Sequence, residues 1–305
     1  MTIGAVPAAH RQAGAPAVGG RGGWAVAGLI GPAYLWLLLT IFLPLSAMLL
    51  FSFLTVAPFG GREAEFTLKH YAAFFQKEFY RTLTWRSLRL GFDVTFWCVV
   101  VGYPTALALA RHVPGRWREA LFLLIVLPFW SNALVRIFSW TMVLRGGGLI
   151  DQTVQAVWPE APSLGILFTY PAIVVGLVHS FLPYMILTCY LSLQAIEPSL
   201  EEAALSLGAS PLTTFRRVTL PLSLPGLLVG VVLIFVPVIG SFMEPRILGG
   251  PEGIMLGTVI EDQFTVVFNW PLGAALSYIL LAIVLLLIAL AAPILGRPLA
   301  AASGR

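Results

Sequence analysis

Six long apolar runs, separated by polar segments and by clusters of glycine and proline, dominate the pattern of this chain. Each run approaches or exceeds the roughly 20 residues that an α-helix needs to cross a bilayer. The pattern therefore predicts an all-α membrane protein with six transmembrane helices. We place these helices at about 25–54, 88–110, 120–144, 171–195, 222–243 and 271–295.

The polar segments predict how the rest of the chain is organised. Residues 1–23, rich in alanine, glycine and proline, predict a flexible tail, 24–297 the membrane domain, and 298–305 a second tail. Three shorter segments are expected to do more than connect helices. They are an aromatic-rich surface helix within 66–85, a short helix at 149–158, and 254–268, which either dips toward the outer mouth of a pathway or caps the bundle.

Composition supports a polytopic membrane protein. Hydrophobic residues make up 58% of the chain and charged residues only 10%, against roughly 25% charged residues in a soluble protein. The net charge of +4 requires no nucleic-acid partner, so the bilayer is the partner that composition indicates. Cys98 and Cys189 lie within apolar runs, which favours small core residues over a disulfide or a metal pair.

The distribution of arginine predicts that both termini lie in the cytoplasm. Cytoplasmic loops carry an excess of Lys and Arg. A cytoplasmic N-terminus places the basic residues of 111–118, 216–217 and the C-terminal tail on that side. The first outer loop disagrees, since it holds five basic and three acidic residues. We keep this orientation because the short loops and both tails support it.

Two charged residues, Asp93 and Arg136, lie inside predicted transmembrane helices. A charge near the bilayer centre costs roughly 2.5–3.5 kcal/mol even on lenient scales, so each needs a partner or water. Their predicted depths are similar, because a helix rises by about 1.5 Å per residue. Two interpretations therefore stay open: a salt bridge between neighbouring helices, or charges that line a solute pathway. The lone His179 is expected to be hydrogen-bonded within the bundle.

The stretch 199–221 predicts a small helix–turn–helix at the membrane surface. Ser199 and Glu202 have the spacing of a capping box at a helix start. Gly208 can take the left-handed conformation that ends this helix. Ser210 is placed to cap a second short helix, which Pro221 is expected to end. The apolar face of the first helix consists of Leu200, Ala203, Ala204 and Leu207.

The fifth apolar run contains Gly226 and Gly230, a small-xxx-small pair. Such a pair favours close approach of another helix. Prolines in the same run favour kinks. A kinked, closely packed helix suits a moving pathway wall, but it also occurs in static bundles.

No catalytic motif is recognisable. The chain lacks H-E-x-x-H, G-x-S-x-G and C-x-x-C patterns. Neither of its two lysines, Lys69 and Lys77, follows a glycine, which excludes a phosphate-binding loop of the form G-x-x-x-x-G-K-[ST]. We therefore predict no enzymatic activity and no cofactor or metal. Energy for active work must come from a partner or an ion gradient.

The stretch 199–221 resembles the E-A-A-x₃-G-x₉-I-x-L-P signature of permease subunits of bacterial ATP-binding-cassette importers. Every fixed position matches except one, where valine replaces the usual isoleucine. The matching residues are Glu202, Ala203, Ala204, Gly208, Val218, Leu220 and Pro221. The resemblance covers most of the chain outside 1–23. Segments at 80–90, 102–104, 127–140, 247–250 and 270–274 look like the spermidine/putrescine branch.

This resemblance implies the type I importer permease fold, with 24–297 as the permease domain, in the bacterial inner membrane. It implies a second permease, which the branch suggests is a different chain, a pair of ATP-binding subunits and a periplasmic solute-binding protein. The coupling loop 197–221 would dock into the ATPase through Glu202 and the apolar face. The branch favours a polyamine such as spermidine or putrescine, but thiamine, iron, phosphonates and opine-like compounds stay open, as does a homodimer.

Two other hypotheses remain beside the importer. An ion-gradient-driven secondary transporter of a small organic solute would use Asp93 and Arg136 as coupling residues, but no inverted internal repeat is evident. A membrane-embedded enzyme lacks any catalytic cluster.

The loop before the last run carries an excess of acids, which bears on the solute. Its acidic residues are Glu244, Glu252, Glu261 and Asp262, and its only basic residue is Arg246. An acidic outer mouth would raise the local concentration of a cation. The alternative is that these acids only contact the binding protein.

Overall fold

The computed structural model describes residues 22–57 and 63–302. Within these ranges every regular element is helical, apart from an isolated bridge between Leu54 and Phe66. Six helices are long and apolar enough to cross a membrane, so the predicted all-α fold class is confirmed. The chain divides into two compact units, Met1–Leu50 and Phe51–Arg305.

The first unit is formed by α1 (Gly22–Ser52) up to Leu50. Its sequence is apolar over nearly its whole length, which matches the first predicted run. The hydroxyl of Thr40 donates to the carbonyl oxygen of Trp36 at 2.8 Å. This bond within the helix satisfies a polar side chain where no water is present.

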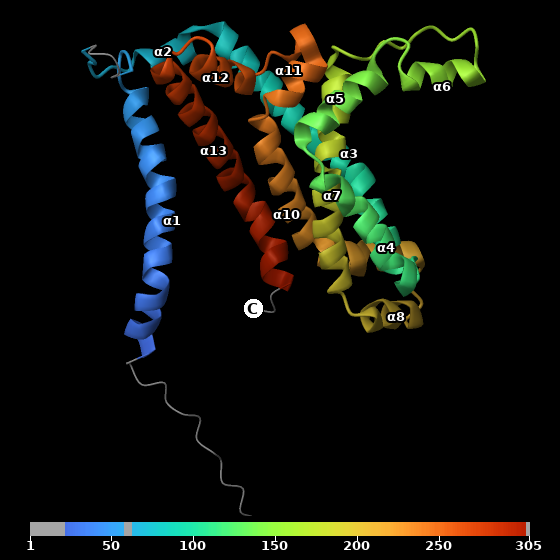
Figure 1. Ribbon diagram of the computed structural model, residues 1–305. Helices are drawn as coiled ribbons and strands as arrows, with labels where there is room; N and C mark the ends of the chain where they lie inside the picture. Colours follow the sequence, from blue (N-terminus) through green and yellow to red (C-terminus); the bar gives the residue numbers. More distant parts are fainter. Residues whose placement is uncertain (1–21, 58–62, 303–305) are drawn as a thin grey trace, which may run out of the picture. The chain divides into compact units, whose positions relative to one another are not determined.

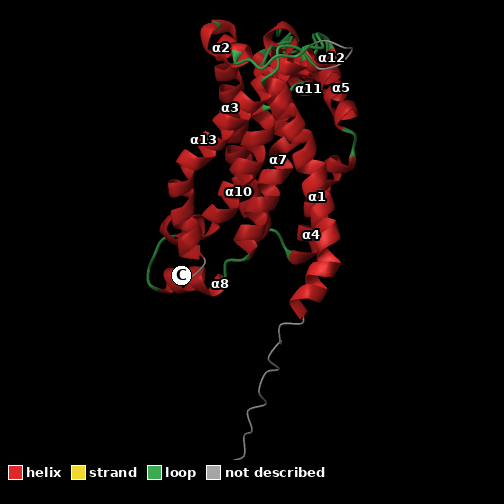
Figure 2. Ribbon diagram, turned by 90° about the vertical axis from the view of Figure 1, so that its left-hand side faces the viewer, coloured by secondary structure: helices red, strands yellow, loops and turns green. Residues whose placement is uncertain are grey.

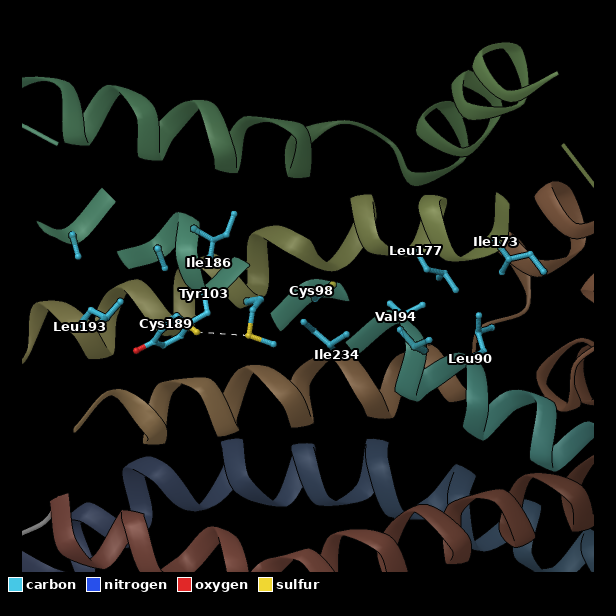
Figure 3. Close-up of a cluster of buried hydrophobic side chains, with 14 of the residues drawn as sticks. Leu90, Val94, Cys98, Tyr103, Ile173, Leu177, Ile186, Cys189, Leu193 and Ile234 are labelled. Atoms are coloured by element: carbon cyan, nitrogen blue, oxygen red, sulfur yellow. Dashed lines mark hydrogen bonds between the residues drawn. The ribbon is translucent and has the colours of Figure 1, made fainter. Parts of the chain in front are cut away.

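The second unit is built on three helices that pack against one another, α3 (Glu78–Arg111), α7 (Tyr170–Gln194) and α10 (Leu220–Ile239) (Figure 1). Figure 3 shows the side chains that fill the space between them. Cys98 and Cys189 belong to this core and are free and buried, which confirms their prediction as core residues.

The close approach predicted from Gly226 and Gly230 is also confirmed. A Cβ atom added to Gly226 would lie 2.4 Å from the carbonyl oxygen of Thr188 on α7. A Cβ atom on Gly230 would lie 2.6 Å from the hydroxyl oxygen of the same threonine. Only glycine leaves room for α7 and α10 to touch at these two levels.

The ends of this unit carry different short helices. Figures 1 and 2 show α2 (Lys69–Gln76), α11 (Met243–Gly249) and α12 (Leu256–Thr265) at one end, here named the α12 end. The opposite end holds α8 (Pro198–Ser206) and is named the α8 end. The last helix, α13 (Trp270–Ala302), packs against α10, α2 and α12.

The α12 end resolves two expectations. The N–H of Leu256 donates to the hydroxyl of Ser87 at 3.0 Å, and Leu256 is fully buried, which favours the capping interpretation of 254–268. The surface helix expected within 66–85 is shorter, because α3 begins at Glu78 instead of residue 88. Hydropathy missed this start because the first turns of α3 carry charged and aromatic side chains and extend past the apolar run.

The third predicted helix, 120–144, is wrong as a single element. The chain there forms α4 (Gly115–Val126), a 3₁₀ turn η1 (Leu127–Trp130) and α5 (Ala133–Leu144). Pro128 cannot donate a backbone hydrogen bond, and the side chain of Asn132 accepts from Leu134 N–H at 2.8 Å to start α5 afresh.

By length and composition the membrane candidate in this part of the chain is Ala133–Val157, which joins α5 to the short helix α6 (Leu149–Val157). The short helix predicted at 149–158 is thereby confirmed. The predicted tails fall mostly outside the described residues, since 1–21 and 303–305 are not described. The first residues of the second tail, 298–302, belong to α13.

Candidate functional site

The start of α8 differs from the predicted capping box. The helix begins at Pro198 with Glu197 as N-cap, and no side chain caps it. Proline at the first helical position already has the right φ and loses no hydrogen bond. The helix therefore starts before Ser199, which lies inside it, and the pairing of Ser199 with Glu202 is wrong.

The end of α8 follows the prediction for Gly208. Its φ is +85°, in the left-handed region. The N–H of Gly208 donates to the carbonyl of Leu205 at 2.9 Å, and the N–H of Ala209 donates to the carbonyl of Ala204 at 3.1 Å. These two bonds form a Schellman motif, which satisfies the last carbonyls of the helix and turns the chain sharply.

After the turn, Ser210 caps α9 (Pro211–Thr214) as predicted, accepting from the N–H of Thr213 at 3.3 Å. Pro221 does not end this helix, and that prediction is wrong. The backbone passes through a π-helical segment, η2 (Phe215–Thr219), directly into α10. Pro221 has no N–H to donate, and the π-helical turn just before it accommodates this loss within a continuous helix.

The predicted motif therefore brackets one turn. Glu202, Ala203 and Ala204 belong to α8, Gly208 forms the turn, and the remaining three residues lie where η2 meets α10. Those three are Val218, Leu220 and Pro221. The motif spacing is thus the length of chain that joins an exposed helix to a core helix.

The large apolar side chains of α8 and of its C-cap are exposed. No residue of α8 is buried, and Leu207 is 89% exposed. Leu200 and Leu205 are each 47% exposed, and Glu202 of the same helix is also exposed. Exposed apolar side chains on a short helix that also presents a charged residue are typical of a protein interface.

Sequence reasoning missed how α8 is held to the bundle. The carboxylate of Glu201 accepts from Nη2 of Arg111 at 2.9 Å and from the hydroxyl of Thr219 at 2.9 Å. Arg111 entered the sequence analysis only as a loop charge. In a pair of adjacent glutamates, helical periodicity alone does not say which one faces inward, so no local signal identified Glu201.

Asp93 lies near the α12 end and has partners other than Arg136. The hydroxyl of Tyr170, the first residue of α7, donates to Asp93 Oδ2 at 2.7 Å. Arg89 Nε lies 3.5 Å from the same oxygen, and its guanidinium lies 5.2 Å from the centre of the Tyr170 ring. The predicted Asp93–Arg136 salt bridge is therefore wrong, because Asp93 is satisfied by its own helix and by α7.

Arg136 instead forms a hydrogen bond to the backbone at the helix break before α5. Its Nη1 donates to the carbonyl of Pro128 at 2.9 Å, while its Nε is buried without a partner. A pocket of about 360 Å³ is lined by Arg136 and His179, among other residues. The ring of His179 packs edge-on against Trp140, with its buried Nδ1 also unpartnered, so the expected hydrogen bond is missing at that atom.

Most acidic side chains at the α12 end have partners within the protein. Arg246 Nη1 lies 2.8 Å from Glu261 Oε2, an ion-pair distance, and Nη2 pairs with Asp262. Glu252 accepts from the N–H of Tyr170 at 2.8 Å. Burial raises the pKa of Glu244, opposed by nearby positive charge. This arrangement weakens the expected acidic mouth, because Arg246 pairs with two of its four acids.

Within 22–57 and 63–302, no group of three or more His, Cys, Asp or Glu side chains could hold a metal ion. The charged side chains of the site instead bond to the protein itself.

The Asp93 cluster gives a first testable expectation. Asp93→Asn and Tyr170→Phe should be coupled by about 1 kcal/mol in a double-mutant cycle, since each removes the same charge-assisted bond. Asp93→Asn and Arg136→Gln should add within about 0.5 kcal/mol, because the two sites share no partner. Unfolding of the unchanged protein, the three single variants and the two double variants in detergent measures both terms. Strong coupling to Arg136 with none to Tyr170 would contradict the observed geometry.

Comparison with known proteins adds independent findings. Residues 102–297 match the model of the family described as "Binding-protein-dependent transport system inner membrane component". The chain is 36% identical to the spermidine/putrescine transport system permease protein PotB of Escherichia coli (strain K12), over 79% of the chain and 87% of that protein. It is 30% identical to the inner membrane ABC transporter permease protein YdcU of the same organism, over 86% of each.

Solved structures show the same fold at lower sequence similarity. A chain of a bacterial ABC transporter involved in the import of alginate superposes with a TM-score of 0.72 at 16% identity, covering 90% of this chain and 96% of that chain. A chain of the MetNI methionine ABC transporter in an inward-facing conformation gives 0.53 at 19% identity, covering 73% and 99%. At these identities the likeness concerns the fold.

Proposed function

Because the chain belongs to the family of inner membrane components of binding-protein-dependent transport systems, we propose that α8 is its docking site for an ATP-binding subunit. The chain is a multi-pass permease subunit of an ABC importer. Our proposal concerns how it is powered, what it carries and how it is oriented. The observation that carries the proposal is the exposed apolar face of α8, fixed to α10 by the turn at Gly208.

Docking at α8 follows from the shape of this surface. An amphipathic helix that lays its apolar face into a groove is a recurring mode of recognition. Leu200 and Leu207 offer the apolar contact, and Glu202 offers a charge that a basic group in the groove can pair with. Since α8 is joined by the turn at Gly208, α9 and η2 to α10, a displacement of α8 reaches the core of the permease.

This assignment sets the orientation and the partners. If ATP-binding subunits dock at α8, the α8 end faces the cytoplasm, and six membrane crossings then leave both termini there. The positive charges of 111–118 and 216–217 support this orientation. The α12 end faces the periplasm and receives a solute-binding protein. A second permease, a different chain, completes the pathway, and residues 24–297 form the permease domain.

The proposed solute is a polyamine such as spermidine or putrescine. The support is the identity to PotB, since Arg246 pairs with two of the four acids at the α12 end and weakens their attraction for a cation. The pocket beside Arg136 borders the pathway in this proposal, because a charge and a histidine with unpartnered nitrogen atoms are too costly to face lipid. The chain performs no catalysis of its own.

The family assignment favours this importer over an ion-driven secondary transporter. That alternative needed Asp93 and Arg136 as a coupled pair. In the structure they have separate partners.

Copurification and uptake together test the proposal. The tagged permease, isolated in mild detergent, should bring down a soluble ATPase. Proteoliposomes that contain the two permeases, the ATPase and the binding protein should take up radiolabelled spermidine or putrescine in an ATP-dependent manner. Glu202→Ala should lower ATPase association by about tenfold, the effect of removing a charged contact at an interface.

Glu197→Ala is the matched control, because Glu197 is an exposed glutamate at the start of the same helix that makes no capping bond. It should leave association within about twofold. Normal association of Glu202→Ala would contradict the docking role. ATP-dependent uptake of an anion by the same complex, with no uptake of either polyamine, would contradict the substrate assignment and leave the permease assignment intact.

A further inference from the structure

Two adjacent glutamates of α8 lie in different surroundings. Successive residues of an α-helix point about 100° apart, at 3.6 residues per turn. Glu201 and Glu202 therefore cannot both face the bundle. The side chain of Glu201 is only 21% exposed, whereas Glu202 is exposed. Their roles must differ, although they carry the same chemical group.

A single oxygen of Glu201 gathers donors from two other elements. Its Oε1 accepts from Nε and Nη2 of Arg111 and from Oγ1 of Thr219. Arg111 is the last residue of α3, and Thr219 is the last residue of η2, at the foot of α10. The carboxylate thus ties α8 to two of the three core helices at the same point.

No residue of α8 is buried, although the helix also lies against α9 and η2. By contrast, Thr219 is 4% exposed. One turn further along α10, Ser223 and Tyr103 of α3 share a buried hydrogen bond of 2.7 Å. Because α3 and α10 are already joined there, a force applied through Glu201 moves them together.

We propose that Glu201 is a positioning residue that transmits movement of α8 to α3 and α10, while Glu202 faces the ATP-binding subunit. The inference rests on the proposed docking at α8. It adds that transport and ATP hydrolysis are joined through the contact of Glu201 with Arg111 and Thr219. Loss of this contact leaves α8 docked but connected to the bundle only through its two flanking turns and its contacts with α9 and η2.

The complete transporter in proteoliposomes tests this division of roles. Glu201→Gln keeps the shape of the side chain and removes the charge. We expect ATPase association and ATP hydrolysis within about twofold of the unchanged protein, and uptake per ATP hydrolysed lower by about tenfold. The charge-reversed double variant Arg111→Glu with Glu201→Arg should recover most of that ratio. A merely structural defect would lower all three quantities together.

Two further variants keep the outcome decisive. Glu197→Gln makes the same substitution at an exposed position and should leave the ratio unchanged. Thr219→Val removes one hydrogen-bond donor to Glu201 with little change of shape, and it should lower uptake per ATP hydrolysed by about threefold. If Glu201→Gln fails to insert into the membrane, Thr219→Val takes its place in the test. An unchanged ratio in Glu201→Gln, or lost ATPase association in Glu201→Gln but not in Glu202→Gln, overturns the inference. Absence of any ATPase on the unchanged permease would instead overturn the proposed function.

Discussion

Replacing Gly208 by valine should abolish ATP-driven uptake while the permease still inserts into the membrane. The φ of Gly208 is +85°, where a β-branched residue is strained by about 1–3 kcal/mol. The surroundings add nothing to this strain, since no atom lies within 4 Å of a Cβ placed there. The expected defect is thus a change of backbone direction between α8 and α9. It would swing the docking face away from the ATP-binding subunit.

Gly208→Asn is the matched control at the same position. Asparagine tolerates the left-handed region far better than valine, so the Schellman motif should persist and uptake should stay within about threefold. Uptake by proteoliposomes and copurification of the ATPase are measured for both variants at equal amounts of inserted permease. Equal uptake by the valine and asparagine variants would show that the turn geometry is irrelevant to coupling.

Replacing Gly226 by alanine should destabilise the bundle more than any other single methyl group added to α10. A Cβ atom there would lie 2.4 Å from the carbonyl oxygen of Thr188 and equally close to the Cβ atom of Ser192. Because a backbone oxygen cannot rotate away as a side chain can, α7 and α10 must separate. Overpacking of this kind costs about 1–3 kcal/mol or more.

Gly240→Ala provides the comparison on the same helix. Its φ is negative, and the added Cβ would meet the carbonyl oxygen of Pro237 at an ordinary contact distance of 3.8 Å. We expect a change within about 0.5 kcal/mol. Thermal unfolding of both variants in the same detergent measures the difference. A stability of Gly226→Ala equal to that of Gly240→Ala would mean that the two core helices pack less tightly than observed.

The sequence alone determined the membrane class and the existence of the spans. Bilayer thickness and the cost of unsatisfied backbone groups in lipid leave few solutions for six apolar runs, so hydropathy suffices. The turn at Gly208 was also predictable, because helix ends are specified locally by the conformational freedom of one residue. Cys98, Cys189, Gly226 and Gly230 followed from their apolar surroundings and from helical spacing.

Only the tertiary structure decided where helices start, break and continue. Pro198 starts α8 early, Pro221 continues a helix that it was expected to end, and Pro128 takes part in a break that hydropathy passed over. Proline has opposite effects in the first turn of a helix and in its interior. The effect of a proline therefore depends on whether the fold places it at the start of a helix or inside one, and sequence spacing does not specify this.

The partners of charged side chains were likewise decided by the fold. Asp93 and Arg136 were plausible partners because their predicted depths in the membrane are similar. Depth does not specify the direction in which a side chain points around the axis of its helix. The structure pairs Asp93 with Tyr170 across α3 and α7, and it bonds Arg136 to the carbonyl of Pro128 at the helix break. Glu201 and Glu202 show the same limit at the α8 end. A rotation of α8 about its axis, which depends on contacts with α3 and α10, decides which glutamate faces the bundle.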